Sequence, residues 1–173
     1  MAEIDIEISL DEGSIQSAIN KINLLQVCLK RASRNVGNYL LDEGEKTAKS
    51  ELERLGVWDP GGPLARSIER TAFSEGTGQI TVGQPYAKYV EYGTGKYSMG
   101  AGKKARGQDV SGINFGKGKR ASTGSWHFQD DEGQWYTTQG QPPKPFMQNT
   151  LNNLKWKVRT KVPEMVEKEI PNL

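Results

Sequence analysis

The feature that most constrains this fold is a long series of apolar residues at steps of three and four, starting at Ile15. This spacing places them on one side of an α-helix, so the series predicts a helix from Ile15 to about Leu55. Forty residues of helix extend about 60 Å. Gly37 and Gly44 lie within it, and a break or bend is expected near them. The stripe contains Ile15, Ala18, Ile22, Leu25, Leu29, Ala32, Val36 and Leu40.

A strand is predicted before this helix, because residues Glu3–Leu10 alternate strictly between polar and apolar. Ile4, Ile6 and Ile8 face the same way in such a strand. An alternating terminal strand can add to the sheet edge of a neighbouring molecule, which makes these three residues candidates for a contact between subunits. Asp11 or Ser14 is the expected cap of the following helix.

Two hairpins are predicted in the middle of the chain, and each is marked by a polar turn between short apolar or aromatic segments. The Gly- and Pro-rich segment Gly56–Pro63 is expected to be a loop that precedes them. Gly93 ends the segment Tyr86–Tyr92, which fits a short helix or a strand. The first hairpin joins Ser67–Ser74 to Gln79–Gly83, and the second places Trp126 and Phe128 against Trp135 and Thr137.

The last predicted element is a helix that starts near Pro145, because proline fits the first helical turn. Pro163 should bend this helix, since proline loses a backbone hydrogen bond and clashes with the preceding turn. The apolar stripe is Met147, Leu151, Leu154, Val158, Val162 and Met165. A basic cluster precedes an acidic one on its polar side, either as a solvated face or as a head-to-tail contact between identical subunits: Lys155, Lys157, Arg159 and Lys161, then Glu164, Glu167 and Glu169.

These elements predict an α+β fold, in which a small antiparallel sheet packs against a long N-terminal helix and a kinked C-terminal helix. The chain of 173 residues is expected to form one domain, residues 1–173, with a flexible insert at about 95–122. Cys28 is the only cysteine, which excludes an internal disulfide and fits a reducing compartment. No apolar segment is long enough to cross a membrane, and the acidic N-terminus is unlike a signal peptide.

The residue patterns of common catalytic and cofactor sites are absent from the sequence. The Gly-Lys pairs at 95–96 and 118–119 lack the other residues of a phosphate-binding loop. His127 is the only histidine, and with the acids at 130–132 it does not complete a typical zinc site or a catalytic triad. We therefore expect no catalytic residues, no metal site and no cofactor, and we expect that the protein is not an enzyme.

The insert is the part of the sequence with the clearest binding chemistry. Residues 95–120 contain seven glycines and seven basic residues, and Asp109 is their only acid. Clustered cations on an adaptable backbone suit phosphate groups, whereas a solvated loop is the plainer alternative. Aromatic residues for base stacking are sparse, so sequence-specific recognition is not expected. The basic residues are Lys96, Lys103, Lys104, Arg106, Lys117, Lys119 and Arg120.

Two segments on either side of the insert resemble a family of tailed-bacteriophage proteins, the tail-component or neck family typified by gene product ten of a lambdoid siphophage. The entry to the first hairpin, Gly62–Ile68, is also similar, and the resemblance covers roughly residues 14–168. Pro143 departs from the family pattern, which more often has a small residue there. The matching residues are Tyr86, Ala87, Tyr89, Val90, Glu91, Tyr92, Gly93 and Thr94 in the first segment, and Gln141, Pro142, Pro145, Phe146 and Met147 in the second.

The resemblance implies a structural protein of the virion head–tail junction, made in the cytoplasm of a bacterial host. Members of this family form homo-oligomeric rings between a head-closure or connector protein and a tail terminator or tail-tube protein. Genomic DNA passes through the lumen without sequence-specific contact. The implied core joins the two segments through Tyr86, Tyr89, Tyr92, Phe146 and Met147. The alternative function is a freestanding nucleic-acid-binding protein that uses the basic insert.

Overall fold

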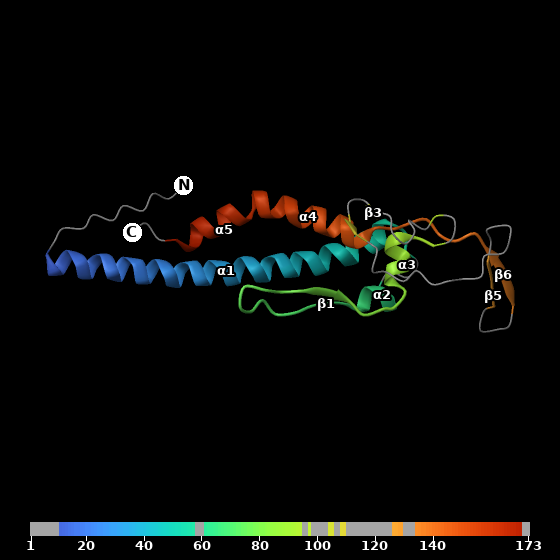
Figure 1. Ribbon diagram of the computed structural model, residues 1–173, viewed down its shortest axis with the longest axis horizontal. Coiled ribbons are helices and arrows are strands. Elements are labelled where there is room, and N and C mark those ends of the chain that lie inside the picture. The colour runs from blue at the N-terminus through green and yellow to red at the C-terminus, as the bar shows by residue number, and fades with distance from the viewer. Residues whose placement is uncertain are drawn as a thin grey trace. The chain divides into compact units, whose positions relative to one another are not determined.

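The computed structural model describes residues 11–57, 61–94, 97, 104–105, 108–109, 126–129 and 134–170. Helices combine with two-stranded sheets, which confirms the predicted α+β class (Figure 1). The chain divides into two compact units. Unit 1 contains the described parts of 1–46, 70–80 and 151–173, and unit 2 contains those of 47–69 and 81–150.

The long helix α1 spans Glu12–Arg54, close to the predicted limits. Asp11 caps it, because its side-chain Oδ1 accepts a hydrogen bond of 2.9 Å from the backbone N–H of Ser14. The expected break does not occur, since α1 continues as one helix through Gly37 and Gly44. The reason for these two glycines is packing against the first hairpin.

This hairpin is built from β1 (Ile68–Arg70) and β2 (Ile80–Val82), which are shorter than predicted. A Cβ at Gly37 would lie 2.3 Å from the ring of Phe73, and one at Gly44 would lie 2.2 Å from the side chain of Ile80. Both distances are far inside van der Waals contact. The absent side chains therefore allow the hairpin to pack directly on the backbone of α1.

A hydrogen bond and ion pairs also hold this hairpin against α1. The side chain of Asn38 accepts a hydrogen bond of 3.3 Å from the backbone N–H of Phe73. The guanidinium of Arg70 lies 2.6 Å from Asp42 and 3.7 Å from Glu45. At the tip, Glu75 and Gly76 both have positive φ values, of 51° and 79°, as a tight two-residue hairpin turn requires.

Pro163 was predicted to bend the C-terminal helix, and the structure instead has an interruption two residues before this proline. Helix α4 spans Phe146–Thr160 and α5 spans Val162–Glu169, with the interruption at Lys161. Within unit 1 these helices run along α1, in the opposite direction (Figure 1). The amine of Lys157 lies 2.6 Å from the carboxylate of Glu43, and Glu169 accepts a hydrogen bond of 2.7 Å from Asn35. Members of both charged clusters of this helix therefore have partners within the chain.

The best-buried apolar side chains belong mainly to unit 2. There the C-terminal end of α1 packs with the short helix α2 (Pro63–Arg66), the start of β1 and the start of α4. Phe146 and Ile68 are each 1% exposed. The buried residues of this core are Ala48, Leu52, Leu64, Ala65, Ile68, Val90 and Phe146.

The predicted stripe lies on one side of α1, but it is only partly buried. Ala18 and Ala32 are buried, together with Cys28. Ile15, Ile22 and Leu29 are 42–46% exposed, because the N-terminal half of α1 has more apolar residues than one contact covers. In α4, Leu151 and Val158 of the second stripe are likewise 40% and 45% exposed.

Two predictions fall wholly or largely on residues that are not described. The strand Glu3–Leu10, with Ile4, Ile6 and Ile8, lies outside the described residues. In the insert, the structure describes Tyr97 and the paired strands β3 (Lys104–Ala105) and β4 (Gln108–Asp109). The second predicted hairpin is present, since β5 (Trp126–Gln129) pairs antiparallel with β6 (Trp135–Thr138). Its predicted pairing was wrong by one position, because Trp126 lies opposite Thr138 and Phe128 lies opposite Tyr136.

Replacing Gly37 tests the close packing of the hairpin on α1. Alanine improves helix propensity by about 1 kcal/mol, but its Cβ overlaps the ring of Phe73. We expect Gly37→Ala to reduce the free energy of unfolding by about 2 kcal/mol, measured by urea denaturation. In the background Phe73→Ala the same substitution should be neutral or stabilising. An equal loss in both backgrounds would contradict direct packing at this position.

The ion pair between Glu43 and Lys157 should make stability depend on acid pH. The hydrogen bond from Lys157 holds the pKa of Glu43 below its ordinary value of 4.5, against the opposing effect of partial burial. Because the folded-state pKa is lowered, the stabilisation is complete above about pH 5 and is lost as the pH falls through the folded-state value. Glu43→Gln should therefore lower the free energy of unfolding at pH 7, measured by urea denaturation, by about 1 kcal/mol or less.

The difference between this variant and the wild type should shrink as the pH falls through the lowered folded-state pKa of Glu43, below which the carboxyl is protonated in both folded and unfolded chains. Glu53→Gln is the matched control, because Glu53 is an exposed carboxylate on the same helix. A difference between Glu43→Gln and the wild type that does not change with pH would rule out the charge as its source.

Candidate functional site

The two segments that carry the family resemblance meet in unit 2, in a feature called here the motif junction: residues 89–94 together with 141–148. The first segment forms α3 (Ala87–Tyr92), which settles the choice between helix and strand. The second is an extended chain that leads into α4. Fifty or so residues separate the contacting pairs in sequence, yet backbone and side-chain hydrogen bonds join them directly.

Glu91 provides the central contact of the motif junction. One carboxylate oxygen accepts a hydrogen bond of 2.9 Å from the backbone N–H of Met147, and the other accepts one of 3.0 Å from that of Gln148. The first backbone bond of α4 runs from Asn149 to the carbonyl of Pro145, which makes Pro145 the N-cap residue. Its prediction as a residue of the first turn is therefore wrong by one position.

A proline cannot cap a helix with its side chain, because it has no oxygen to accept from the free N–H groups. Glu91 supplies that oxygen from another element, at the two N–H groups that a capping side chain usually reaches. Its negative charge also lies at the positive end of the helix dipole. The Glu91 side chain is buried, with the residue only 6% exposed, so these bonds are shielded from water.

Backbone hydrogen bonds extend the motif junction on both sides of Glu91. The N–H of Lys144 donates to the carbonyl of Val90 at 2.8 Å. Two hydrogen bonds of 2.9 Å join Thr94 and Gln141. The N–H of Thr94 donates to the carbonyl of Gln141, and the N–H of Gln141 donates to Oγ1 of Thr94. The two segments are thus held together along their length.

Gly93 is required for this close approach for two reasons. Its φ of 73° is in the region that residues with a side chain rarely adopt. A Cβ there would also lie 2.8 Å from the carbonyl oxygen of Gln141 and 2.9 Å from the nitrogen of Pro143. Both neighbours are backbone atoms and cannot rotate away. The sequence predicted Gly93 as a terminator of the segment, and the structure adds this contact.

The predicted core residues of the two segments have different environments. Phe146 is 1% exposed and Val90 is 7% exposed, so both belong to the core. Tyr89, Tyr92 and Met147 are partly buried. Tyr86 is 42% exposed, and its placement in the core was wrong. Burial raises the pKa of the Tyr92 hydroxyl, and the negative charge of Glu91 raises it further.

A second polar contact joins α1 to the start of α4. Glu51 accepts hydrogen bonds from the guanidinium of Arg54, at 2.7 and 2.9 Å, and from the side-chain amide of Asn149 at 2.7 Å. The bond from Arg54, assisted by Asn149, holds the pKa of Glu51 below its ordinary value. Around the motif junction, the described carboxylates of Glu51 and Glu91 therefore serve as hydrogen-bond acceptors that fix α4.

The motif junction has the chemistry of a structural clamp. The acceptor atoms of Glu91 are directed at backbone N–H groups, which have no reactive proton to exchange in catalysis. Sequence reasoning included Glu91 in the family motif but missed this role. The available signal was an acidic residue in an apolar segment, together with a later helix that begins at a proline and has no capping side chain.

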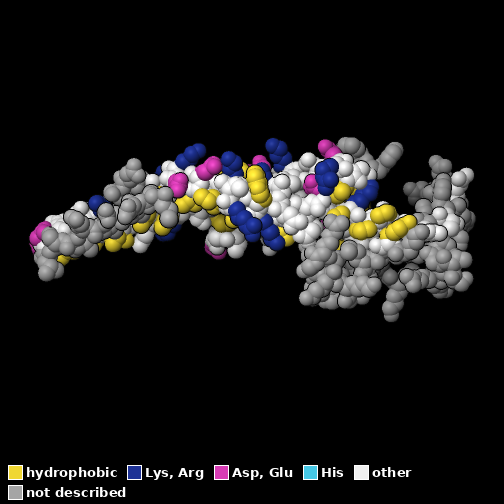
Figure 2. Space-filling model, turned by 90° about the horizontal axis from the view of Figure 1, so that it is seen from above, with side chains coloured by type: hydrophobic (Ala, Val, Ile, Leu, Met, Phe, Trp, Pro, Cys, Tyr) yellow, Lys and Arg dark blue, Asp and Glu magenta, His cyan; other side chains and the backbone are white. Residues whose placement is uncertain are grey.

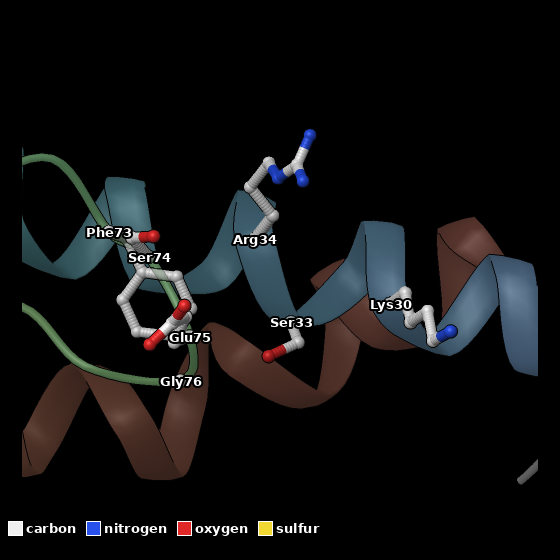
Figure 3. A pocket seen from close by; sticks show the side chains of 7 residues that line it. All are labelled: Lys30, Ser33, Arg34, Phe73, Ser74, Glu75 and Gly76. Carbon is white, nitrogen blue, oxygen red and sulfur yellow. The ribbon is translucent and has the colours of Figure 1, made fainter.

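The structure also contains a hollow of about 350 Å³ between α1 and the tip of the first hairpin, in unit 1 (Figure 3). Lys30 and Arg34 line it from α1, and Phe73 and Glu75 line it from the hairpin. In Figure 3 the charged ends of Lys30 and Arg34 point in different directions and do not converge on one point. The hollow therefore lacks the arrangement of a binding site for a small anion.

The remaining candidate residues are placed as follows. Cys28 is a buried thiol on α1, and His127 lies in β5, paired with Thr137 of β6. Lys104 begins β3. Among the described residues, no three His, Cys, Asp or Glu side chains cluster as metal ligands do. The other basic residues of the insert lie outside the described part of the chain: Lys96, Lys103, Arg106, Lys117, Lys119 and Arg120.

No described helix is both long enough and apolar enough to cross a membrane. Comparison of the chain with protein-family models, with curated proteins and with solved structures found no match.

Replacing Glu91 by glutamine tests the clamp. One of the two N–H groups of α4 would then face an amide that donates, and the charge at the helix terminus would be lost. We expect a loss of about 2–3 kcal/mol in the free energy of unfolding. Glu69→Gln, at an exposed carboxylate in β1 of the same unit, should change it by less than about 0.5 kcal/mol. Equal effects of the two substitutions would contradict the capping role.

Proposed function

We propose that this protein is a ring-forming structural component of a phage head–tail junction, a neck or tail-completion protein without catalytic activity. The observation that carries the proposal is the motif junction. The two segments whose sequences resemble the neck family are the two that the fold joins through Glu91, Thr94 and Gln141. Their shared occurrence in one sequence thus has a physical reason, since neither segment is complete without the other.

The chemistry of the junction supports a structural role. A buried carboxylate that caps a helix increases rigidity and provides no group for turnover. A subunit of a ring around DNA needs a fixed core and variable surfaces that contact its neighbours. The motif junction provides the first, and the insert at about 95–122, which lies between Thr94 and Gln141 in sequence, provides a candidate for the second.

The proposed partners follow from this role. They are further copies of the chain, a head-closure or connector protein on one side, and a tail terminator or tail-tube protein on the other. Genomic DNA would pass through the lumen. The seven basic residues of the insert are the candidates for contact with DNA or with a neighbouring ring: Lys96, Lys103, Lys104, Arg106, Lys117, Lys119 and Arg120.

Assembly state is the first test of this proposal. We expect the purified chain to form closed rings, seen by negative-stain electron microscopy and as a discrete high mass in light scattering at raised concentration. We also expect genes for a portal, a head-closure protein and a major tail protein beside its own. A strict monomer at high concentration that is also absent from purified virions would refute the proposal.

DNA binding separates this function from the freestanding nucleic-acid-binding protein. That alternative requires the isolated chain to bind duplex DNA tightly, with an affinity that falls steeply as salt increases. It also requires the binding to be lost when the seven basic residues are replaced by glutamine. A ring protein needs no such affinity as a free subunit, so rings without tight DNA binding would favour the neck function.

A further inference from the structure

The N-terminal half of α1 has an unusual composition for a helix on a protein surface. Residues 13–29 include one charged side chain, Lys21, whereas charged residues make up 25% of the whole chain. Apolar residues in this segment nevertheless remain exposed. Six large ones are each 42–53% exposed: Ile15, Ile19, Ile22, Leu24, Val27 and Leu29. Hydrophobic side chains are visible along this end of α1 at the left of Figure 2.

The exposed residues form two separate faces of the helix. At about 100° per residue, Ile15, Ile19, Ile22 and Leu29 share one side, called here face 1. Leu24 and Val27 form face 2, which lies roughly 150° away around the helix axis. One ligand or one groove would cover only one of these faces.

Farther along α1, the side of the helix that carries each face is covered by another element of unit 1. Face 1 is in line with Gly37 and Gly44, where the hairpin packs. Face 2 is in line with Asn35 and Arg31, which contact Glu169 near the end of α5. Within unit 1, α1 thus extends past the hairpin tip and past Glu169, and large apolar residues remain exposed on both sides.

We infer that these two faces are the contact surfaces between neighbouring copies of this chain, with face 1 of one subunit packed on face 2 of the next. A cyclic ring needs two different surfaces on each subunit, one for each neighbour, and they must lie on different sides. A helix that is apolar on two sides meets this requirement. The inference rests on the proposed ring function and names the surface that closes the ring.

The near absence of charge supports identical copies as the occupant. In a ring with α1 helices side by side, the same residues lie at the same height in every subunit. Charged residues at each turn would then place like charges together, which is destabilising. This segment instead has uncharged polar residues: Gln16 and Asn23 lie between the faces, Gln26 lies on face 1 and Asn20 lies on face 2. Depletion of charge is also typical of the centre of protein interfaces.

The exposed area fits the apolar centre of such a contact. Half of six large side chains amounts to a few hundred Å² of apolar surface, which is divided between the two faces. A specific interface buries about 800 Å² on each partner. The two faces of α1 therefore form the centre of the contact, and surfaces around them supply the rest.

A mixing experiment with two full-length variants tests the inference. Ile22→Glu blocks face 1 and Val27→Glu blocks face 2, and both residues are exposed, so neither change disturbs the buried side of α1. By light scattering we expect the wild type to have the mass of a ring and each variant alone to have the mass of one chain. Mixed in equal amounts, the variants should form a dimer that cannot grow, because each retains one intact face.

Asn23→Glu is the control, because it places the same charge on the polar strip between the faces and should leave the ring intact. Circular dichroism must show unchanged helicity, and Ile19→Glu with Leu24→Glu provides a second pair. Wild-type rings that persist in both single variants, or a mixture that stays monomeric, would overturn this inference and leave the ring function standing. A wild type that forms no ring would instead count against the function itself.

Discussion

The start of α4 depends on one buried carboxylate. A helix that begins after a proline has backbone N–H groups without partners, and burying them unpaired costs about 1–3 kcal/mol each. Glu91 satisfies two of them at 2.9 and 3.0 Å, from a short helix that lies 56 and 57 residues earlier in sequence. With α4 fixed there, Phe146 enters the core of unit 2, and the contact of Asn149 with Glu51 can form. The packing of unit 2 therefore depends on an electrostatic contact between α3 and the start of α4, which are far apart in sequence.

The regular elements were predictable from the sequence wherever a local rule decides them. The apolar residues spaced three and four apart from Ile15 predicted the long helix, and the polar turn around Glu75 and Gly76 predicted the first hairpin. Pro163 predicted a bend close to the interruption between α4 and α5, because the loss of a backbone donor does not depend on the rest of the fold. The strand lengths were overestimated, since β1 and β2 have three residues each.

The features that define the motif junction were not predictable in the same way, because they depend on which distant segments meet. Nothing near Glu91 in sequence shows that its carboxylate caps a helix. Gly37 and Gly44 suggested flexibility, whereas their role is to let Phe73 and Ile80 lie against the helix backbone. The apolar stripe of α1 combined residues of two kinds: Ala18 and Ala32 are covered within the chain, while Ile15 and Ile22 are not. A periodic pattern shows which residues share a side of a helix, but not which partner covers them.

The paired bonds between Thr94 and Gln141 have a consequence for how such a chain can change during evolution. These bonds join Thr94 to Gln141, so residues 95–140 leave the core and return to it at adjacent points. The entropy of closing a loop changes by only about 0.6 kcal/mol when its length is doubled or halved. Insertions, deletions and wholesale replacement between these two residues are therefore nearly neutral for the fold. The same core can therefore carry segments of different length and sequence between Thr94 and Gln141, while the clamp around Glu91 stays the same.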